Sequence, residues 1–370
     1  MKPLLDKARS LSEEAVAAVE SIVVVESPSE DLPACRRAIE ATAAVSDSWL
    51  SAPATVVELG NGTCGLRWGP TTPRVLLLGH VDTVWPLGTI TRLPFTRIDD
   101  RMTGPGIFDM KTGVIQALLA LRLAESTEDV GLLLTTDEEI GSHGSREAIS
   151  VACSRAEAVL VFEPSADGAL KTRRKGTSWY RLNFVGRAAH AGLDPHRGVN
   201  ALLAAASASV DLVELADGDT TVTPTLLTAG TTANTVPASA ELTIDVRAWS
   251  SDEQQRVDRG IRGYSSTRGS MTVSGGVDRP ALEHSMTQSL FAIAQRVAHD
   301  LGLPPLAEAS VGGASDGNLT AAAGVGTLDG LGALGDGAHA DHEWASVSGM
   351  VERAALAAGI IEALIEKRPA

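Results

Sequence analysis

A histidine and a carboxylate lie two residues apart at the end of a very apolar stretch. Residues 75–84 read VLLLGHVDTV, and consecutive apolar residues followed by glycine are typical of a strand buried on both faces. Positions i and i+2 of a strand point the same way, so His80 and Asp82 should share a face. An imidazole that binds a metal needs an acceptor for its other ring nitrogen, and Asp82 could provide it. A strand-end hydrogen bond without metal is the alternative.

Further acids follow similar apolar stretches. Residues 130–135 and 158–162 predict two more buried strands, and acidic residues come directly after both. The carboxyl ends of parallel strands meet at one edge of an α/β sheet, so side chains at these ends should converge there. The candidates for a hydrolytic metal site are His80, Asp82, Asp109, Glu138, Glu139, Glu163 and, much later, His339.

Imidazole and carboxylate ligands without cysteine suit zinc, cobalt or manganese. A carboxylate shared by two such ions can hold them about 3.5–4 Å apart. The adjacent acids Glu138 and Glu139 suggest a division of labour, because neighbouring residues at a strand end face opposite ways. One could bind metal while the other moves protons. An acidic pair by itself is more often a solvated turn.

Composition bounds the remaining possibilities. A chain of 370 residues with 44% hydrophobic residues is long enough for two domains. The net charge of -15 argues against nucleic acid or an anionic membrane surface as the partner. Apolar runs stay well short of the roughly 18 residues that span a bilayer. The first 20 residues predict an amphipathic helix rather than an export signal, so we expect a cytoplasmic protein. The three cysteines imply neither a disulfide framework nor a thiolate metal site.

The pattern along the chain predicts an α/β catalytic domain that an α+β domain interrupts. Strand and helix patterns alternate up to residue 174 and resume at 284, where a helix begins the last part of the chain. We expect the last helix to span 344–367. Between these parts, the predicted elements are strands at 177–186, 221–227, 238–246 and 271–273, with helices at 200–215 and 252–262. The predicted domains are therefore 1–174 with 284–370, and an inserted domain at 175–283.

Eight short motifs together resemble one known family. They are GHVDTV, GPGIFDMKTG, TTDEEIGS, FEPS, RAAHAG, NTVPASAELTIDVR, GGASDGN and GDGAHADHE, and they extend from about residue 75 to 342. In this order and spacing they resemble the M20 family of dinuclear zinc peptidases, closest to the glutamate carboxypeptidases. The resemblance implies a zinc-peptidase-like mixed sheet flanked by helices and a ferredoxin-like inserted domain that forms a homodimer.

The resemblance also implies roles for particular residues. By similarity, one zinc ion has the ligands His80, Asp109 and Glu163. The other has Asp109, Glu139 and His339, so Asp109 is the bridge. Glu138 matches the general base and acid, Asp82 orients His80, and the Asp109–Met110 peptide bond is cis. His342 is a rival for the last ligand, but the GAH context favours His339. His143 reads as a loop residue.

The resemblance implies two kinds of substrate contact, and the sequence offers a third. His190 matches a histidine that a second subunit contributes to stabilise the oxyanion. Arg279 and Asn234 match positions that hold the substrate carboxylate, and Arg247 either supports them or forms a structural ion pair. Arg174 and Lys175 could bind an acidic side chain, although surface charges are the more ordinary interpretation.

The predicted function is hydrolysis of the amide bond before a C-terminal amino acid, glutamate first, in N-acyl or peptidyl conjugates. Two zinc ions would be the cofactors, with cobalt or manganese as substitutes. An aminoacylase or a di- or tripeptidase using the same metals is the nearest alternative. A non-catalytic ligand-binding protein of this fold is the alternative outside hydrolysis, and Glu138 argues against it.

Overall fold

The computed structural model describes residues 2–366. This part of the chain divides into two compact units. Unit 1 contains the described residues up to 173, together with 283–311 and those from 315 onward. Unit 2 contains residues 174–282 and 312–314. Each unit has its own sheet and core.

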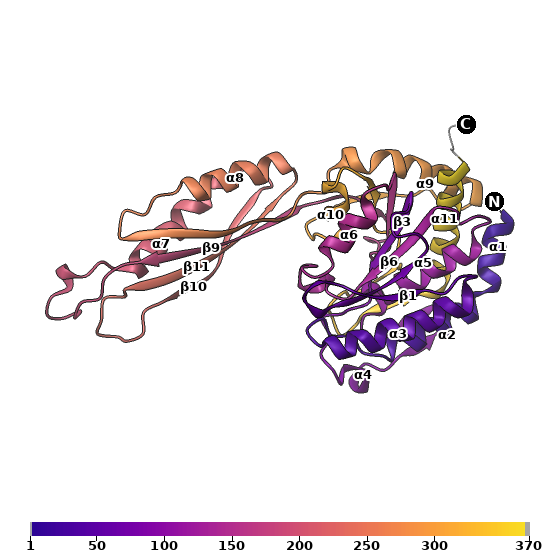
Figure 1. Cartoon of the computed structure of the whole chain (residues 1–370), viewed down its shortest axis with the longest axis horizontal. Helices are drawn as coiled ribbons and strands as arrows, with labels where there is room; N and C mark the ends of the chain where they lie inside the picture. Colours follow the sequence, from indigo (N-terminus) through magenta and orange to yellow (C-terminus); the bar gives the residue numbers. More distant parts are fainter. Residues whose placement is uncertain (1, 367–370) are drawn as a thin grey trace. The chain divides into compact units, whose positions relative to one another are not determined.

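A six-stranded mixed sheet with the order β1-β2-β6-β3-β7-β14 forms the centre of unit 1 (Figure 1). Strand β3 runs parallel to β6 and to β7, and the register sets His80 beside Thr135. The carboxyl ends of β3, β6 and β7 therefore lie at the same sheet edge, and the fold class predicted from the sequence is confirmed. The strands are β1 (Thr55–Glu58), β2 (Cys64–Trp68), β3 (Val75–His80), β6 (Val130–Thr135), β7 (Ala158–Val161) and β14 (Gly326–Leu328).

Helices cover both faces of this sheet (Figure 1). Alternate residues of β3 enter different cores, with Leu77 in the larger one and Leu76 and Leu78 in the smaller one. This burial on two sides explains why β3 is apolar without interruption. The larger core contains residues of α1 (Lys2–Ser10), α2 (Ser12–Val23), α3 (Leu32–Trp49), α5 (Thr112–Leu123), α9 (Gln288–Leu301) and α11 (Val347–Glu366). Residues of α6 (Arg146–Cys153) and α10 (Asp316–Ala322) belong to or pack against the smaller core.

A small four-stranded sheet, ordered β15-β16-β5-β4, corrects one prediction about the last helix. Trp344–Ser346 forms strand β16, which pairs with β5, so helix α11 begins only at Val347. The predicted end at Lys367 lies outside the described residues. The remaining elements of unit 1 are α4 (Thr89–Arg92), β4 (Thr96–Ile98), β5 (Arg101–Thr103), β8 (Leu170–Arg174), which ends at the first residue of unit 2, β13 (Glu308–Val311) and β15 (Gly335–Asp336).

Unit 2 has the element order βαββαβ and an antiparallel sheet ordered β10-β11-β9-β12. This is the ferredoxin-like arrangement. Even-numbered residues of β9, such as Tyr180 and Leu182, pack on both helices, whereas Trp179 on the opposite face is 59% exposed. The elements are β9 (Gly176–Val185), α7 (Ala201–Asp211), β10 (Thr221–Ala229), β11 (Ser239–Ala248), α8 (Ser251–Gly263) and β12 (Ser270–Arg279). Within residues 2–366, no helix is both long and apolar enough to cross a bilayer.

Candidate active site

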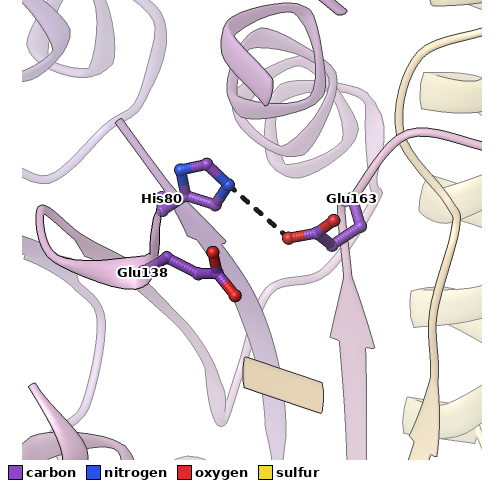
Figure 2. A group of neighbouring side chains, drawn as sticks. All are labelled: His80, Glu138 and Glu163. Atoms are coloured by element: carbon purple, nitrogen blue, oxygen red, sulfur yellow. Dashed lines mark ion pairs between the residues drawn. The ribbon is translucent and has the colours of Figure 1, made fainter. Parts of the chain in front are cut away.

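His80 ends strand β3 and faces two carboxylates. Its ring is 1% exposed, and its Nε2 lies 3.5 Å from Asp109 Oδ1 and 3.5 Å from Glu163 Oε1. Glu163 follows strand β7, which is the parallel neighbour of β3. Figure 2 shows His80 and Glu163 pointing toward one another, with Glu138 beside them. The sheet register therefore brings together side chains that are far apart in the sequence.

The second oxygen of Asp109 faces another imidazole. Asp109 Oδ2 lies 3.6 Å from His339 Nε2, and that same nitrogen lies 3.2 Å from Glu139 Oε2. His339 adopts a left-handed backbone conformation with φ of 61°. Asp109 is thus the shared member of two sets, one with His80 and Glu163 and the other with Glu139 and His339. His342, the rival candidate, is exposed and belongs to neither set.

The spacing of these atoms suits metal ions better than direct hydrogen bonds. Ligands at about 2.0–2.1 Å from a tetrahedral zinc ion are roughly 3.3 Å from one another. The separations of 3.2–3.6 Å around Asp109 are close to that value. Asp109 Oδ1 is also buried and accepts no hydrogen bond from any described residue. A buried carboxylate oxygen without a donor fits a position where a cation would bind. These residues therefore fit a pair of divalent ions.

The electrostatics of the cluster also favour cations. Contact with Glu139 raises the pKa of His339 to about 9, although partial burial opposes the rise. Burial alone would lower the pKa of His80, but the neighbouring carboxylates of Asp109, Asp82 and Glu163 raise it well above its usual value. Burial also raises the pKa of Glu139. Excess negative charge held away from water is the common cause.

Asp82 holds several members of the cluster in place by hydrogen bonds. His80 Nδ1 lies 3.0 Å from the backbone oxygen of Asp82 and 3.4 Å from its Oδ1, so both acceptors of this residue face the ring. The fully buried carboxylate also accepts hydrogen bonds from the backbone N–H groups of Glu138 at 3.3 Å and Glu139 at 3.2 Å. The Ser29 hydroxyl donates to its Oδ2 at 2.7 Å. Asp82 therefore orients the ring of His80 and the backbone of Glu138 and Glu139. The contact with Ser29 was not predicted from the sequence.

Glu138 and Glu139 do not continue strand β6. They begin the 3-10 helix η3 (Glu138–Ile140), so the explanation that neighbouring strand residues face opposite ways was wrong. The turn nevertheless brings both acids near His80, in two different groups. Glu138 groups with His80 and Glu163, whereas Glu139 groups with His80 and Asp109, each set having ligand atoms within 4.8 Å of one another.

The segment before helix α5 carries Asp109. It forms the π-helical turn η2 (Ile107–Lys111), and the Asp109–Met110 peptide bond is cis, as the resemblance predicted. Gly106 has φ of 71°, and a Cβ atom there would lie 2.4 Å from Thr83 Cγ2, so only glycine fits. The backbone N–H groups of this segment donate to Glu343, another residue that was not predicted from the sequence. Burial raises the pKa of Glu343 to about 7, and these donors oppose the rise.

All six predicted substrate residues lie in unit 2. His190 is exposed, and its Nδ1 accepts hydrogen bonds from the backbone N–H groups of Gly192 at 3.1 Å and Leu193 at 3.2 Å. This leaves the proton on Nε2, which can donate outward. The backbone oxygen of Asn234 accepts from Ala191 N at 2.9 Å, so the segments that carry Asn234 and His190 lie side by side. Their roles in catalysis and binding stay predictions.

The arginine candidates differ in exposure. Arg247 pairs with Asp245 at 2.9 Å and is partly exposed, whereas Arg279 is only 4% exposed. Both lie beside Thr177, Arg247 on β11 and Arg279 on β12. Arg174 is not a surface charge, because it is 3% exposed and donates to the backbone oxygen of Gly313 at 3.0 Å. Lys175 donates to the backbone oxygen of Asp219 and lies over the ring of Trp249.

Two proteins of known name are similar to this chain in sequence. Carboxypeptidase G2 of Pseudomonas sp. (strain RS-16) is 30% identical over 322 residues, which cover 82% of this chain and 77% of that protein. Acetylornithine deacetylase of Salmonella arizonae is 30% identical over 192 residues, which cover 47% of this chain and 50% of that protein.

A solved structure has the same fold across nearly the whole chain. It is a dinuclear metal-binding peptidase of family M20 from Bacillus subtilis, with a TM-score of 0.66 at 12% identity. The match covers 97% of this chain and all of that one. The family model described as peptidase family M20/M25/M40 matches residues 76–363. The family match and the similarity to carboxypeptidase G2 together show a hydrolase, and the chain belongs to the M20/M25/M40 family of peptidases.

Proposed function

We propose that this hydrolase releases a C-terminal amino acid, glutamate first, from N-acyl or peptidyl conjugates. The single observation that carries the proposal is Asp109, whose two oxygens face the imidazoles of His80 and His339. The similarity to carboxypeptidase G2 supports release of a C-terminal residue. The preference for glutamate rests on the motifs that resemble the glutamate carboxypeptidases.

We further propose which residues hold the cofactors. His80, Asp109 and Glu163 would hold one ion, and Glu139, His339 and the other oxygen of Asp109 would hold the second. Zinc suits these ligands, and cobalt or manganese could replace it. When bound, such a pair supplies Lewis acidity, which polarises a carbonyl group and lowers the pKa of a water molecule.

Glu138 would move the proton. Its carboxylate lies in the cluster with His80 and Glu163, and Asp82 holds its backbone N–H. Glu138 would take a proton from the attacking water as the water oxygen bonds to the amide carbon. It would return that proton to the amide nitrogen when the carbon–nitrogen bond breaks, so the products are a carboxylic acid and a free amine.

Unit 2 would complete the site. His190 can donate from Nε2, because backbone N–H groups occupy its Nδ1. Such a donor would stabilise the developing oxyanion. We propose that residues 175–283 form the dimerisation domain and that His190 reaches the site of the partner subunit in a homodimer. Arg279 and Asn234, supported by Arg247, would bind the substrate carboxylate.

A related hydrolase activity is the second candidate. The similarity to acetylornithine deacetylase favours an N-acyl amino acid amidohydrolase with the same metals and the same Glu138. The two proposals differ in the part of the substrate that the enzyme recognises. We also propose that the protein acts in the cytoplasm, which the three buried, unpaired cysteines support.

Hydrolysis of a substrate panel tests the function. The panel contains N-acyl-glutamate, N-acyl-alanine, N-acetylornithine and dipeptides, each measured before and after dialysis against a chelator. We expect the highest kcat/KM for N-acyl-glutamate and loss of hydrolysis without metal. A preference for N-acetylornithine would favour the second candidate. Hydrolysis of none of these compounds by the metal-loaded protein would contradict both.

A further inference from the structure

The buried carboxylate of Glu343 holds the segment that carries Asp109. Glu343 is 3% exposed and belongs to neither proposed set of metal ligands. Its Oε1 accepts from Phe108 N at 2.9 Å and Asp109 N at 3.1 Å. Its Oε2 accepts from Gly106 N at 2.9 Å and Trp85 Nε1 at 3.0 Å. Each oxygen therefore accepts from two donors. An ionised carboxylate can accept all four of these hydrogen bonds, because neither of its oxygens carries a proton.

The same hairpin carries His339. Glu343 lies four residues after His339, in the connection between β15 and β16. Short backbone hydrogen bonds close this turn, from Ala340 N to Gly337 O and from Glu343 N to Ala340 O, both at 2.9 Å. A Cβ atom on Gly337 would lie 2.9 Å from the backbone of Glu343, so the turn is tightly packed. Movement of Glu343 would therefore disturb the backbone on both sides of the pair formed by His339 and Asp109.

We propose that Glu343 is a positioning residue for one of the two metal ions, the one bounded by Asp109, Glu139 and His339. The inference rests on the proposed dinuclear function. Glu343 fixes the separation of Asp109 and His339, which come from segments more than 200 residues apart, by joining one hairpin to the other loop. The remaining ligands of the first ion are His80, at the end of β3, and Glu163, which follows β7; these strands pair with each other and do not depend on the Glu343 carboxylate.

Replacement of Glu343 by glutamine removes the charge and one acceptor atom while keeping the size of the side chain. A glutamine side chain has almost the same shape, but one of its terminal atoms is an NH2 group that only donates. In Glu343→Gln that group would face two N–H donors, whichever of the two oxygens it replaces. A loss of alignment is expected without a cavity, because the volume is unchanged.

The matched control is Glu26→Gln. Glu26 also uses a carboxylate to hold a backbone segment, accepting from Gly88 N at 2.8 Å and Ile90 N at 2.9 Å. That segment carries no proposed ligand. Both variants lose a charge and a carboxylate-to-backbone contact, so only a specific role of Glu343 distinguishes them.

The experiment is a titration of the metal-free full chain with Co²⁺ in the absence of substrate. Calorimetry and visible absorption monitor the binding of each ion. We expect two ions per chain in the wild type and in Glu26→Gln. In Glu343→Gln, the ion that Glu139 and His339 would hold should bind about 10- to 100-fold more weakly, and the other ion, which shares only Asp109 with this arrangement, should lose much less affinity. The absorption band of the weakened ion should appear only at higher Co²⁺ concentration, and hydrolysis should recover at that same concentration.

The outcomes are separable. Wild-type affinity for both ions in Glu343→Gln would overturn the inference, as would equal weakening of both ions. A wild type that binds fewer than two ions would instead contradict the proposed dinuclear function. If Glu343→Gln does not fold, Trp85→Phe removes a single donor to the same carboxylate. A smaller weakening of the same ion is then expected, and two unchanged ions would overturn the inference.

Discussion

The candidate residues of unit 1 and unit 2 are held in different ways. In unit 1, His80 and Asp82 are almost fully buried, and Asp82 fixes the ring and the next acidic segment through several hydrogen bonds. In unit 2, His190 is exposed and Arg247 pairs with its neighbour Asp245, although Arg279 is only 4% exposed. We infer that the proposed metal ligands of unit 1 are positioned before substrate binds, whereas His190 and Arg247 would exchange water or a local partner for the substrate.

Metal removal should have the largest effect, because it acts on the buried cluster alone. Dialysis against a chelator should reduce hydrolysis to background, since neither the attacking water nor the carbonyl would then be activated. Adding back Zn²⁺ or Co²⁺ should restore the rate. Metal content by mass spectrometry, measured beside kcat, checks this. Full activity in a preparation with almost no bound metal would remove the basis for assigning chemistry to unit 1.

Glu138→Ala should have the next largest effect. Loss of the proposed proton carrier should lower kcat by about 10²- to 10⁴-fold while both ions remain bound. The matched control is Glu147→Ala, which changes an exposed acid on α6. The measurement is kcat with N-acyl-glutamate together with metal content. Near-normal turnover in Glu138→Ala would assign the proton transfer to another group.

His190→Ala tests whether unit 2 contributes to the chemical step. Removal of an oxyanion donor should lower kcat by about 10²- to 10³-fold with unchanged metal content. His196→Ala alters another exposed histidine of the same unit and should behave like the wild type. An equal effect of the two variants, or an effect on KM alone, would confine unit 2 to binding and sharpen the contrast between the units.

The arginine variants should have the smallest effects on turnover. Arg279→Lys keeps the charge but loses the planar fork, and we expect KM for N-acyl-glutamate to rise by about 10-fold with little change in kcat. Arg247→Lys should change KM less, because its guanidinium already pairs with Asp245. Steady-state kinetics and the melting temperature of both variants separate binding from stability. The reverse order would make Arg247 the direct contact.

The sequence was most informative where a candidate site residue lies at or just after the end of a buried strand. Apolar runs identified β3, β6 and β7, and the acids and imidazole at their ends lie together at one sheet edge. The start of the last helix was wrong because Trp344–Ser346 is a strand only through its pairing with Arg101–Thr103. Such pairing depends on residues far away in the chain rather than on local propensity.

Supporting residues were also missed for a physical reason. Ser29 and Glu343 act by hydrogen bonds to Asp82 and to the backbone around Asp109, at separations of 53 and 234 residues. A serine or a glutamate has no local pattern that reveals such a partner. The one available signal was the position of Glu343, four residues after His339 in the motif GDGAHADHE.

Leu76, Leu77 and Leu78 alternate between two cores, and this alternation fixes the register of strand β3 and so the direction in which His80 points. Inserting or deleting one residue within β3 would turn His80 toward the opposite side of the sheet and push leucines into the wrong core. Natural variation in length should therefore collect in the connecting loops and spare this strand. Anyone grafting the site onto another scaffold would have to copy the strand register before copying any ligand.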